Sequence, residues 1–183
     1  MNEKNFLEEL KNHWIKNDIP NITFTNANFL RDLLKIKKVK KILEIWTANG
    51  FSTINFAFEL KNMWWWNITT IEFSPKSYWD ALNNFKEAWV IDYINPLLWN
   101  ALDIIPLLKD KYDFVFIDGM KKRSKDFLEL VWNKTKIWGI IIIDDVIKFK
   151  HKMLSLYDYV EENNIKYNII PIDEDDGIMM IIK

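Results

Sequence analysis

Hydrophobic residues recur at two different spacings along the chain. Near the N-terminus, apolar side chains at helical spacing predict one helix over residues 6–16 and a second over 26–36. From Lys41 onward, short apolar runs alternate with longer stretches of helical spacing. The apolar runs, which predict strands, are Lys41–Ile45, Ile68–Glu72, Tyr93–Leu98, Tyr112–Ile117 and Ile140–Asp144. The helical stretches that separate and follow them are 52–61, 75–88, 102–109, 124–135 and 152–163.

Strands that alternate with helices are typical of βαβ units, in which helices cover both faces of a parallel sheet. The run Ile140–Ile143 supports this interpretation, because it is apolar on both faces, as a central parallel strand should be. Near the C-terminus, Tyr167–Ile172 and Ile178–Ile182 predict two strands joined by a turn. The sequence therefore predicts an α/β fold: a Rossmann-like, mostly parallel seven-stranded sheet with helices on both faces and a C-terminal antiparallel hairpin.

The length of 183 residues and the hydrophobic content of 49% predict a single domain with one well-buried core. Residues 1–38 are expected to form N-terminal helices and residues 39–183 the Rossmann-like core. A net charge of −1 argues against a globally basic nucleic-acid-binding protein, and the absence of cysteine excludes disulfides and thiolate metal sites. Because no run of about 18 apolar residues occurs and the N-terminal segment is polar, we expect no membrane span, no signal peptide and a cytoplasmic location.

The residues that follow the predicted strands are the candidates for function, because ligands bind at the carboxyl ends of strands in such sheets. The loop from Glu44 to Gly50 leads into a helix whose first N–H groups can hold a ligand, although an ordinary turn is the alternative. Gly50 is the loop's only glycine, so the glycine fingerprint of dinucleotide sites is absent. Glu72 ends the second strand, where a carboxylate either binds ribose hydroxyls or caps the next helix.

Three carboxylates follow the fourth and fifth predicted strands, namely Asp118, Asp144 and Asp145. Carboxylates at adjacent strand ends repel one another unless a cation lies between them. Oxygen ligands without histidine or cysteine suit Mg²⁺, Mn²⁺ or Ca²⁺. These residues therefore predict a divalent-cation site, with helix capping by one or two of the acids as the alternative.

Five segments, in this order, resemble class I S-adenosylmethionine-dependent methyltransferases. They are ILEIWTANGFSTINFA, ITTIEFSP, NALDIIPLL, YDFVFIDGMKK and GIIIIDDV. More narrowly, the pattern is similar to the cation-dependent O-methyltransferases related to catechol and caffeoyl-coenzyme A O-methyltransferases, over roughly residues 25–183. The resemblance implies transfer of a methyl group from S-adenosylmethionine to a hydroxyl, assisted by Mg²⁺ or Mn²⁺, and a possible homodimer, since dimers are common in that family.

The resemblance also implies residue roles. The first loop would surround the methionine part of the cofactor, Glu72 would hold the ribose hydroxyls, and residues 100–102 would line the adenine. The full set of cofactor-binding candidates is Glu44, Trp46, Thr47, Ala48, Gly50, Ser52, Glu72, Phe73, Asn100, Ala101, Leu102 and Asp118. The cation would be bound by Asp118, Asp144 and Asp145. Lys121 falls at the position of the family's catalytic lysine, and Asp118 is assigned to catalysis with it.

Two departures from the family pattern stand out. The family usually has Asp-Asn where this chain has Asp144-Asp145, which adds a negative charge. It has glycine where this chain has tryptophan at four places, Trp46, Trp89, Trp99 and Trp138. At Trp46 an indole should fill the space for the cofactor.

The counts of glycine and tryptophan point the same way. The chain has 4 glycines and 10 tryptophans, whereas average usage of about 7% would give about 13 glycines. Lysine, isoleucine and asparagine are abundant and only two of the 25 basic residues are arginine, which is typical of an AT-rich genome. In some such genomes UGA encodes glycine, so we predict that several tryptophans, including Trp64, Trp65 and Trp66, are misread glycines. The alternative is a genuinely tryptophan-rich, degenerate methyltransferase.

The acceptor of the methyl group is open at this point: a small phenol or diol and a hydroxylated tRNA base both fit. A tRNA would favour a local basic rim, for which the candidates are Lys121, Lys122, Arg123, Lys125, Lys148, Lys150, His151 and Lys152. A merely solvated surface is the alternative. If Trp46 blocks the cofactor, the chain would instead be a nucleotide-binding protein without methyl transfer. An NAD-dependent oxidoreductase is disfavoured by the missing glycine fingerprint.

Overall fold

The computed structural model describes residues 2–16, 21–61 and 67–183, so Trp64, Trp65 and Trp66 lie outside the described residues. The helices are α1 (Glu3–Ile15), α2 (Phe24–Lys37), α3 (Phe51–Leu60), α4 (Pro75–Glu87), α5 (Ala101–Ile104), α6 (Ser124–Trp132) and α7 (Leu154–Glu162). The strands are β1 (Lys41–Ile45), β2 (Asn67–Glu72), β3 (Ile94–Leu98), β4 (Tyr112–Ile117), β5 (Thr135–Ile143), β6 (Tyr167–Ile170) and β7 (Ile178–Ile182).

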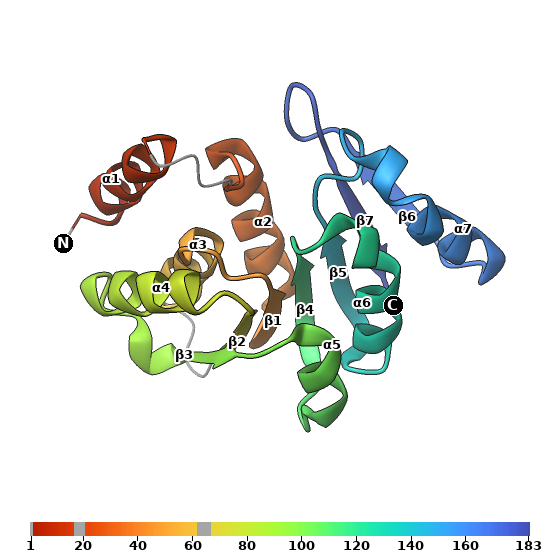
Figure 1. Cartoon of the computed structure of the whole chain (residues 1–183), viewed down its shortest axis with the longest axis horizontal. Helices are drawn as coiled ribbons and strands as arrows, with labels where there is room; N and C mark the ends of the chain where they lie inside the picture. Colours follow the sequence, from red (N-terminus) through yellow and green to blue (C-terminus); the bar gives the residue numbers. More distant parts are fainter. Residues whose placement is uncertain (1, 17–20, 62–66) are drawn as a thin grey trace.

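The strands form one seven-stranded sheet in the order β3-β2-β1-β4-β5-β7-β6 (Figure 1). Strands β1 to β5 pair in parallel, whereas β7 runs antiparallel to both β5 and β6. The predicted mostly parallel sheet with a C-terminal antiparallel hairpin is therefore confirmed.

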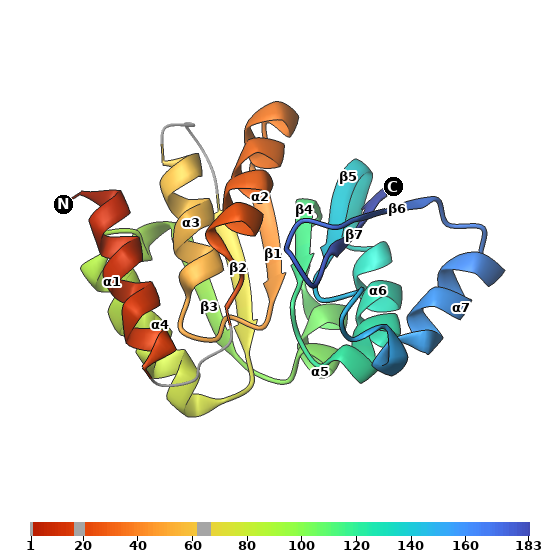
Figure 2. The ribbon, with the colours of Figure 1, turned by 90° about the horizontal axis from the view of Figure 1, so that it is seen from above.

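Alternation along the strands divides the core into two layers. Ile42, Phe114 and Ile142 pack with α2, α3 and α4 on one face of the sheet. Leu43 and Val115 pack with α5, α6 and α7 on the other, and Figures 1 and 2 show these two groups of helices on opposite sides of the strands. Because both faces are covered, the central strands are mostly apolar, and Glu44 in β1 is a buried exception.

Two predicted elements differ from the structure more than the others do. The helix expected over residues 102–109 ends at Ile104 and continues as a 3-10 turn over Ile105–Leu107, because Pro106 has no N–H to extend the α-helical hydrogen bonds. Strand β5 begins five residues before its expected start. Its pairing with β4 shifts register between Tyr112 and Phe114, and the additional residues of β5 lie in this irregular segment.

The order of the strands places a crevice at the carboxyl ends of β1 and β4. From β1 the chain builds outward through β2 and β3, and then returns to place β4 on the other side of β1. Loops that follow β1 and β4 therefore diverge to opposite sides, which is where such sheets bind ligands. Within the described residues, no helix is long and apolar enough to cross a membrane.

Candidate functional site

Glu44, near the end of β1, lies beneath the first loop and is fully buried. Its carboxylate accepts hydrogen bonds from the hydroxyls of Ser52 (2.5 Å), Thr53 and Thr70 (2.6 Å), and Thr47 contacts Thr70 in turn at 2.6 Å. Burial raises the pKa of Glu44 to about 7, although the three hydroxyls oppose the rise. The structure therefore places Glu44 where it holds the loop, with no surface left for a ligand.

The loop after β1 has an unusual backbone. Trp46, Ala48 and Gly50 all have positive φ, at 83°, 50° and 88°. The N–H of Trp46 donates to the carbonyl of Ile71 at 2.9 Å, which fixes the start of the loop against β2. At Gly50 a Cβ atom would lie 2.4 Å from the ring of Phe85, so both the φ and the close approach require glycine there.

Glu72, at the end of β2, joins the first loop to the second. One carboxylate oxygen accepts from the N–H of Ala48 at 2.8 Å. The other accepts from the N–H groups of Phe73 and Ser74 at 2.9 and 2.7 Å. Helix α4 is capped by Ser74, whose hydroxyl accepts from the N–H of Ser77. Glu72 is thus not the capping residue of α4, and the sequence-based alternative of a capping acid does not hold.

A pocket of about 300 Å³, which we term the smaller pocket, lies beside this loop. Five predicted cofactor residues line it together: Trp46, Phe73, Asn100, Ala101 and Leu102. The side chain of Asn100 accepts from the N–H of Leu102 at 3.1 Å and thereby begins α5 at the pocket wall. The lining is mostly apolar, with Ile71 and Phe127 adding to it, which suits a flat heteroaromatic ring.

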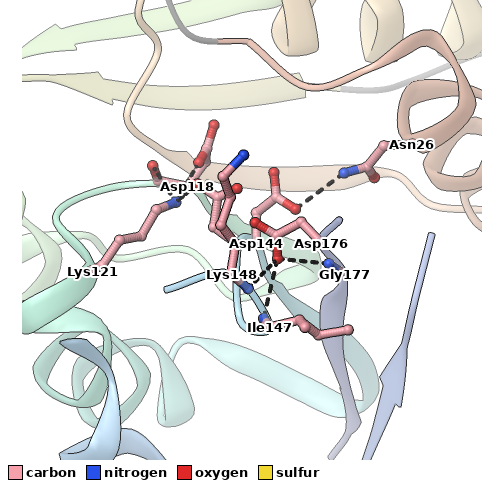
Figure 3. A network of polar contacts seen from close by, with 9 residues as sticks. Asn26, Asp118, Lys121, Asp144, Ile147, Lys148, Asp176 and Gly177 are labelled. Carbon is pink, nitrogen blue, oxygen red and sulfur yellow. Dashed lines mark hydrogen bonds and ion pairs between the residues drawn. The ribbon is translucent and has the colours of Figure 1, made fainter. Parts of the chain in front are cut away.

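The predicted catalytic lysine lies between two of the predicted cation ligands. The ammonium nitrogen of Lys121 lies 2.8 Å from an oxygen of Asp118 (Figure 3). It also lies 2.6 Å from an oxygen of Asp145. Burial alone would lower the pKa of Lys121, but the two carboxylates outweigh burial and raise it. As these side chains lie, Lys121 is a protonated counter-ion. Asp145 has a φ of 63°, a conformation that asparagine and aspartate tolerate better than most residues.

Asp144 is buried next to this pair and takes a different partner. The amide nitrogen of Asn26, in α2, donates to a carboxylate oxygen of Asp144 at 3.1 Å (Figure 3). Burial and the charges of Asp118 and Asp145 raise the pKa of Asp144 well above its usual range. The side-chain oxygen of Asn26 is buried and has no hydrogen-bond partner within the described part of the chain.

Asp176, in the turn between β6 and β7, holds the loop that follows β5. One of its oxygens accepts from the N–H groups of Ile147 (3.1 Å), Lys148 (3.1 Å) and Gly177 (2.7 Å), as Figure 3 shows. Sequence reasoning missed both Asn26 and Asp176. Asn26 is 118 residues from its partner and Asp176 is 28 or 29 residues from two of its own, so no local spacing marks them.

A second pocket of about 480 Å³, which we term the acidic pocket, is lined by Asp118, Lys121, Asp144, Asp145 and Asp176. Six aspartates and three lysines face it: Asp118, Asp144, Asp145, Asp173, Asp175, Asp176, Lys121, Lys148 and Lys152. Part of the predicted basic rim is paired with nearby carboxylates. Lys148 pairs with Asp175 at 2.6 Å, Arg123 with Asp126 at 2.5 Å and Lys125 with Glu129 at 3.1 Å.

The side chains fit the predicted cation and the predicted cofactor only in part. Within the described residues, no three acidic or histidine side chains are placed to hold a metal ion, and Lys121 and Asn26 contact the three aspartates. The donor set itself suits a hard divalent cation, since the partners of the three carboxylates include a single ammonium, which pairs with Asp118 and Asp145, and the neutral amide of Asn26 at Asp144. For the cofactor, the smaller pocket fits an adenine ring, but Trp46 lines both pockets and lies at their boundary. A ligand that extends from one pocket into the other meets its indole.

Comparison with known proteins identifies a family and individual proteins whose sequences are similar to this chain. A model of the O-methyltransferase family matches residues 1–179. A catechol O-methyltransferase from Mycobacterium tuberculosis is 29% identical over 134 residues, which cover 72% of this chain and 60% of that protein. A caffeoyl-CoA O-methyltransferase from Populus kitakamiensis is 30% identical over 141 residues, covering 74% and 59%. The chain thus spans less than two thirds of the length of these curated relatives.

Solved structures show the same architecture. The structure of an O-methyltransferase from Bacillus cereus in complex with SAH has a TM-score of 0.87 with this chain. The alignment covers 98% of this chain and 91% of that one, at 23% sequence identity. At this identity the likeness concerns the fold, which is nearly complete in both chains.

Proposed function

The chain belongs to the O-methyltransferase family, as its sequence predicts, and we propose that it transfers the methyl group of S-adenosylmethionine to a hydroxyl oxygen of a small acceptor. One observation carries this proposal: an apolar, adenine-sized pocket and an acidic pocket with a partly buried lysine adjoin at the carboxyl ends of β1 and β4. Methyl transfer needs both, because the cofactor and the acceptor oxygen must be held side by side.

The cofactor is assigned to the β1–β3 half of the crevice. Ala101 and Leu102 supply apolar contacts for the adenine, while Asn100 fixes the start of α5 beside it. Glu72 is the carboxylate available for the ribose hydroxyls, since it ends β2 next to Phe73 in the pocket wall. In binding ribose it would exchange hydrogen bonds that it now makes to backbone N–H groups for bonds to the hydroxyls.

A divalent cation is assigned to Asp118, Asp144 and Asp145. The structural support is electrostatic: the raised pKa of Asp144 arises from burial and from the neighbouring carboxylates, so the cluster lacks positive charge. When bound there, Mg²⁺ or Mn²⁺ would lower the pKa of an acceptor hydroxyl. Asn26 orients Asp144 through its 3.1 Å hydrogen bond, and Asp176 holds the loop that carries Asp145.

Lys121 is assigned as the acceptor of the hydroxyl proton. Its ammonium now neutralises Asp118 and Asp145, and a lysine held in this way stays protonated at neutral pH. Lys121 loses much of that stabilisation when the two carboxylates serve a divalent cation, which favours the neutral amine. The same residue thereby balances the cluster in one state and accepts a proton in the other.

The charge of the acidic pocket favours a small neutral or cationic acceptor over a phosphate-bearing one. Six aspartates face the pocket against three lysines, and like charges on the acceptor and the protein repel each other. A diol of the catechol type fits this chemistry better than a hydroxylated base within a tRNA. The position of Trp46 favours a second candidate, a nucleotide-binding protein without methyl transfer, if the indole excludes the cofactor.

The test is a methyl-transfer assay with labelled S-adenosylmethionine. Because Trp46 lies between the pockets, the assay uses both the chain as written and its Trp46→Gly variant, each with a catechol-type diol and with bulk tRNA. We expect label in the diol, in the presence of Mg²⁺, for Trp46→Gly at least. Label in tRNA would reverse the acceptor assignment. If the chain as written neither binds S-adenosylhomocysteine nor labels either acceptor, the nucleotide-binding alternative is favoured.

A further inference from the structure

Among the residues that the structure describes, three tryptophans lie in left-handed backbone. Trp46, Trp89 and Trp138 have φ angles of 83°, 57° and 64°. For a bulky side chain a positive φ is a genuine outlier, whereas glycine adopts it without steric cost. All three are among the four positions at which the sequence pattern predicts glycine.

Trp89 occupies the place at the end of α4 that is usually glycine. The N–H of Trp89 donates to the carbonyl of Lys86 at 3.0 Å, and the N–H of Val90 donates to that of Phe85 at 3.0 Å. These two bonds define a Schellman motif, whose left-handed residue is most often glycine. The helices α2 and α7 end in the same way with Lys38 and Asn164. The motif therefore tolerates a side chain at this position, but an indole adds no stabilising contact to it.

Trp138 lies in the irregular segment of β5, directly before Gly139. Its N–H donates to the carbonyl of Lys183 at 2.6 Å, and pairing with β4 shifts register across this segment. A left-handed residue at such a break is typically glycine. The indoles of Trp138 and Trp89 are 71% and 78% exposed, so packing does not repay the strained backbone at either position.

Trp46 has the same backbone signature and a functional consequence. Its side chain lines both pockets, and a Cβ atom built on Gly119 of the neighbouring β4 loop would lie 3.5 Å from its indole. The indole therefore fills the junction between the β1 and β4 loops. Without a side chain at position 46, the smaller pocket and the acidic pocket would meet beside Met120, which also lines both.

We infer that the protein made in its own cells has glycine at positions 46, 89 and 138, and that glycine at position 46 opens one continuous trough for S-adenosylmethionine. The part concerning position 46 rests on the proposed function, whereas the part concerning positions 89 and 138 rests on backbone geometry alone. Trp99 has no positive φ, so the structure gives no such reason for glycine there.

The first experiment measures cofactor binding by calorimetric titration with S-adenosylhomocysteine. Trp46→Gly should bind about tenfold more tightly than the chain as written, or more, since the indole competes for the same space. Trp46→Ala removes the indole but keeps a Cβ atom in left-handed backbone, so it should gain binding without gaining thermal stability. Equal affinity of all three proteins would overturn the role of position 46.

The second experiment measures the melting temperature Tm of the remote variants. Trp89→Gly and Trp138→Gly should each raise Tm by about 2–4 °C, because strain is relieved and little packing is lost. The matched control is Trp79→Gly, which removes an indole of 60% exposure from the interior of α4. It should lower Tm by a similar amount, since glycine weakens a helix. If Trp89→Gly and Trp138→Gly lowered Tm as the control does, the inference that the backbone is strained at positions 89 and 138 would be wrong.

The third experiment identifies the native residues directly. Peptide masses of the protein isolated from its source cells should correspond to glycine at positions 46, 89 and 138, and masses corresponding to tryptophan would overturn the inference. The outcomes also separate this inference from the proposed function. If the masses indicate glycine and Trp46→Gly still fails to bind S-adenosylhomocysteine, the methyltransferase assignment fails while the inferred residues stand.

Discussion

The crevice at the carboxyl ends of the strands has two halves, and the carboxylates in each half have different kinds of partner. In the β1–β2 half, Glu44 accepts from three hydroxyls and Glu72 from three backbone N–H groups. In the β4–β5 half, three aspartates depend mainly on one ammonium, that of Lys121, and on the amide of Asn26. The first half is complete within the protein, whereas the second keeps an excess of negative charge.

This difference indicates which half is scaffold and which is chemistry. Neutral hydrogen-bond donors fix the geometry of the first loop without adding charge. The first loop can therefore be held rigidly before a ligand binds. An uncompensated cluster costs stability and persists where a cation or substrate completes it. Variants in the two halves should therefore affect different measurements.

The largest expected effect concerns Lys121 in the β4–β5 half. The experiment uses whichever protein binds S-adenosylhomocysteine, the chain as written or Trp46→Gly; we term it the cofactor-binding form. In this form, Lys121→Met should lower kcat by about 10²–10⁴, the usual range for loss of a general base. Binding of S-adenosylhomocysteine should change little, because Lys121 does not line the smaller pocket. The measurement is turnover with labelled S-adenosylmethionine, repeated after EDTA treatment, which should abolish activity until Mg²⁺ is restored.

The matched control for that variant is Lys111→Met. Lys111 is exposed and immediately precedes β4, at the opposite end of the strand from Asp118. It should leave kcat unchanged. Turnover that persists in EDTA would show that the three aspartates serve the fold rather than a cation, and a harmless Lys121→Met would assign the proton to another group.

The second expected effect concerns Glu44 and the pH dependence of stability. Its pKa is raised from 4.5 to about 7 in the folded protein, so the folded state binds this proton more tightly than the unfolded state. The stabilisation that the protonated Glu44 carboxyl contributes is therefore fully present below about pH 4.5 and is lost as pH rises through about 7. Between pH 5 and pH 8, Glu44→Gln should lose less unfolding free energy than the parent, by on the order of 2–3 kcal/mol.

Denaturant unfolding at the two pH values measures this difference. Comparing the change with pH in each protein removes the cost of the altered hydrogen bonds, which is present at both pH values. Mg²⁺ should not alter the Glu44 contribution, because its carboxylate is satisfied by hydroxyls within the protein. Parallel pH curves for parent and variant would refute the raised pKa.

The third expected effect concerns Glu72 and cofactor affinity. In the cofactor-binding form, Glu72→Ala should weaken binding of S-adenosylhomocysteine by roughly tenfold or more, since a hydrogen bond to a charged group contributes about 1.5–3 kcal/mol. Glu72→Asp keeps the charge but shortens the reach to Ala48, so it separates ribose binding from support of the loop. Calorimetric titration gives both values, and an unchanged dissociation constant for Glu72→Ala would confine Glu72 to a structural role.

The fold could be predicted from the sequence because its signals are local. β1, β4 and β7 begin and end at the residues that their apolar runs indicate. α5 was predicted too long, because one proline outweighed the apolar spacing that follows it. The strand-end rule also brought Asp118, Asp144, Asp145 and Lys121 together, since it depends on topology and not on side-chain detail.

The partners of those residues could not be predicted in this way. Asn26 reaches Asp144 from a helix 118 residues away, and Asp176 reaches across from the final hairpin. The raised pKa of Lys121 has the same origin, since burial alone would lower it and the outcome depends on how closely Asp118 and Asp145 approach the ammonium. Such contacts come from packing between distant elements, for which one sequence carries no spacing signal.

The smallest expected effect concerns Asp144, and it tests whether the second half awaits a cation. At pH 8 without metal, Asp144→Asn should raise Tm by about 2–4 °C, because it removes a buried charge from a repulsive cluster. Adding Mg²⁺ should raise the Tm of the parent, since a ligand that binds the folded state stabilises it, and should raise that of Asp144→Asn less. Glu44→Gln is the matched control, because it alters a buried carboxylate outside the cluster and should keep the full response to Mg²⁺. If Mg²⁺ shifts the parent and Asp144→Asn equally, the two halves of the crevice do not differ in the way their hydrogen bonds indicate.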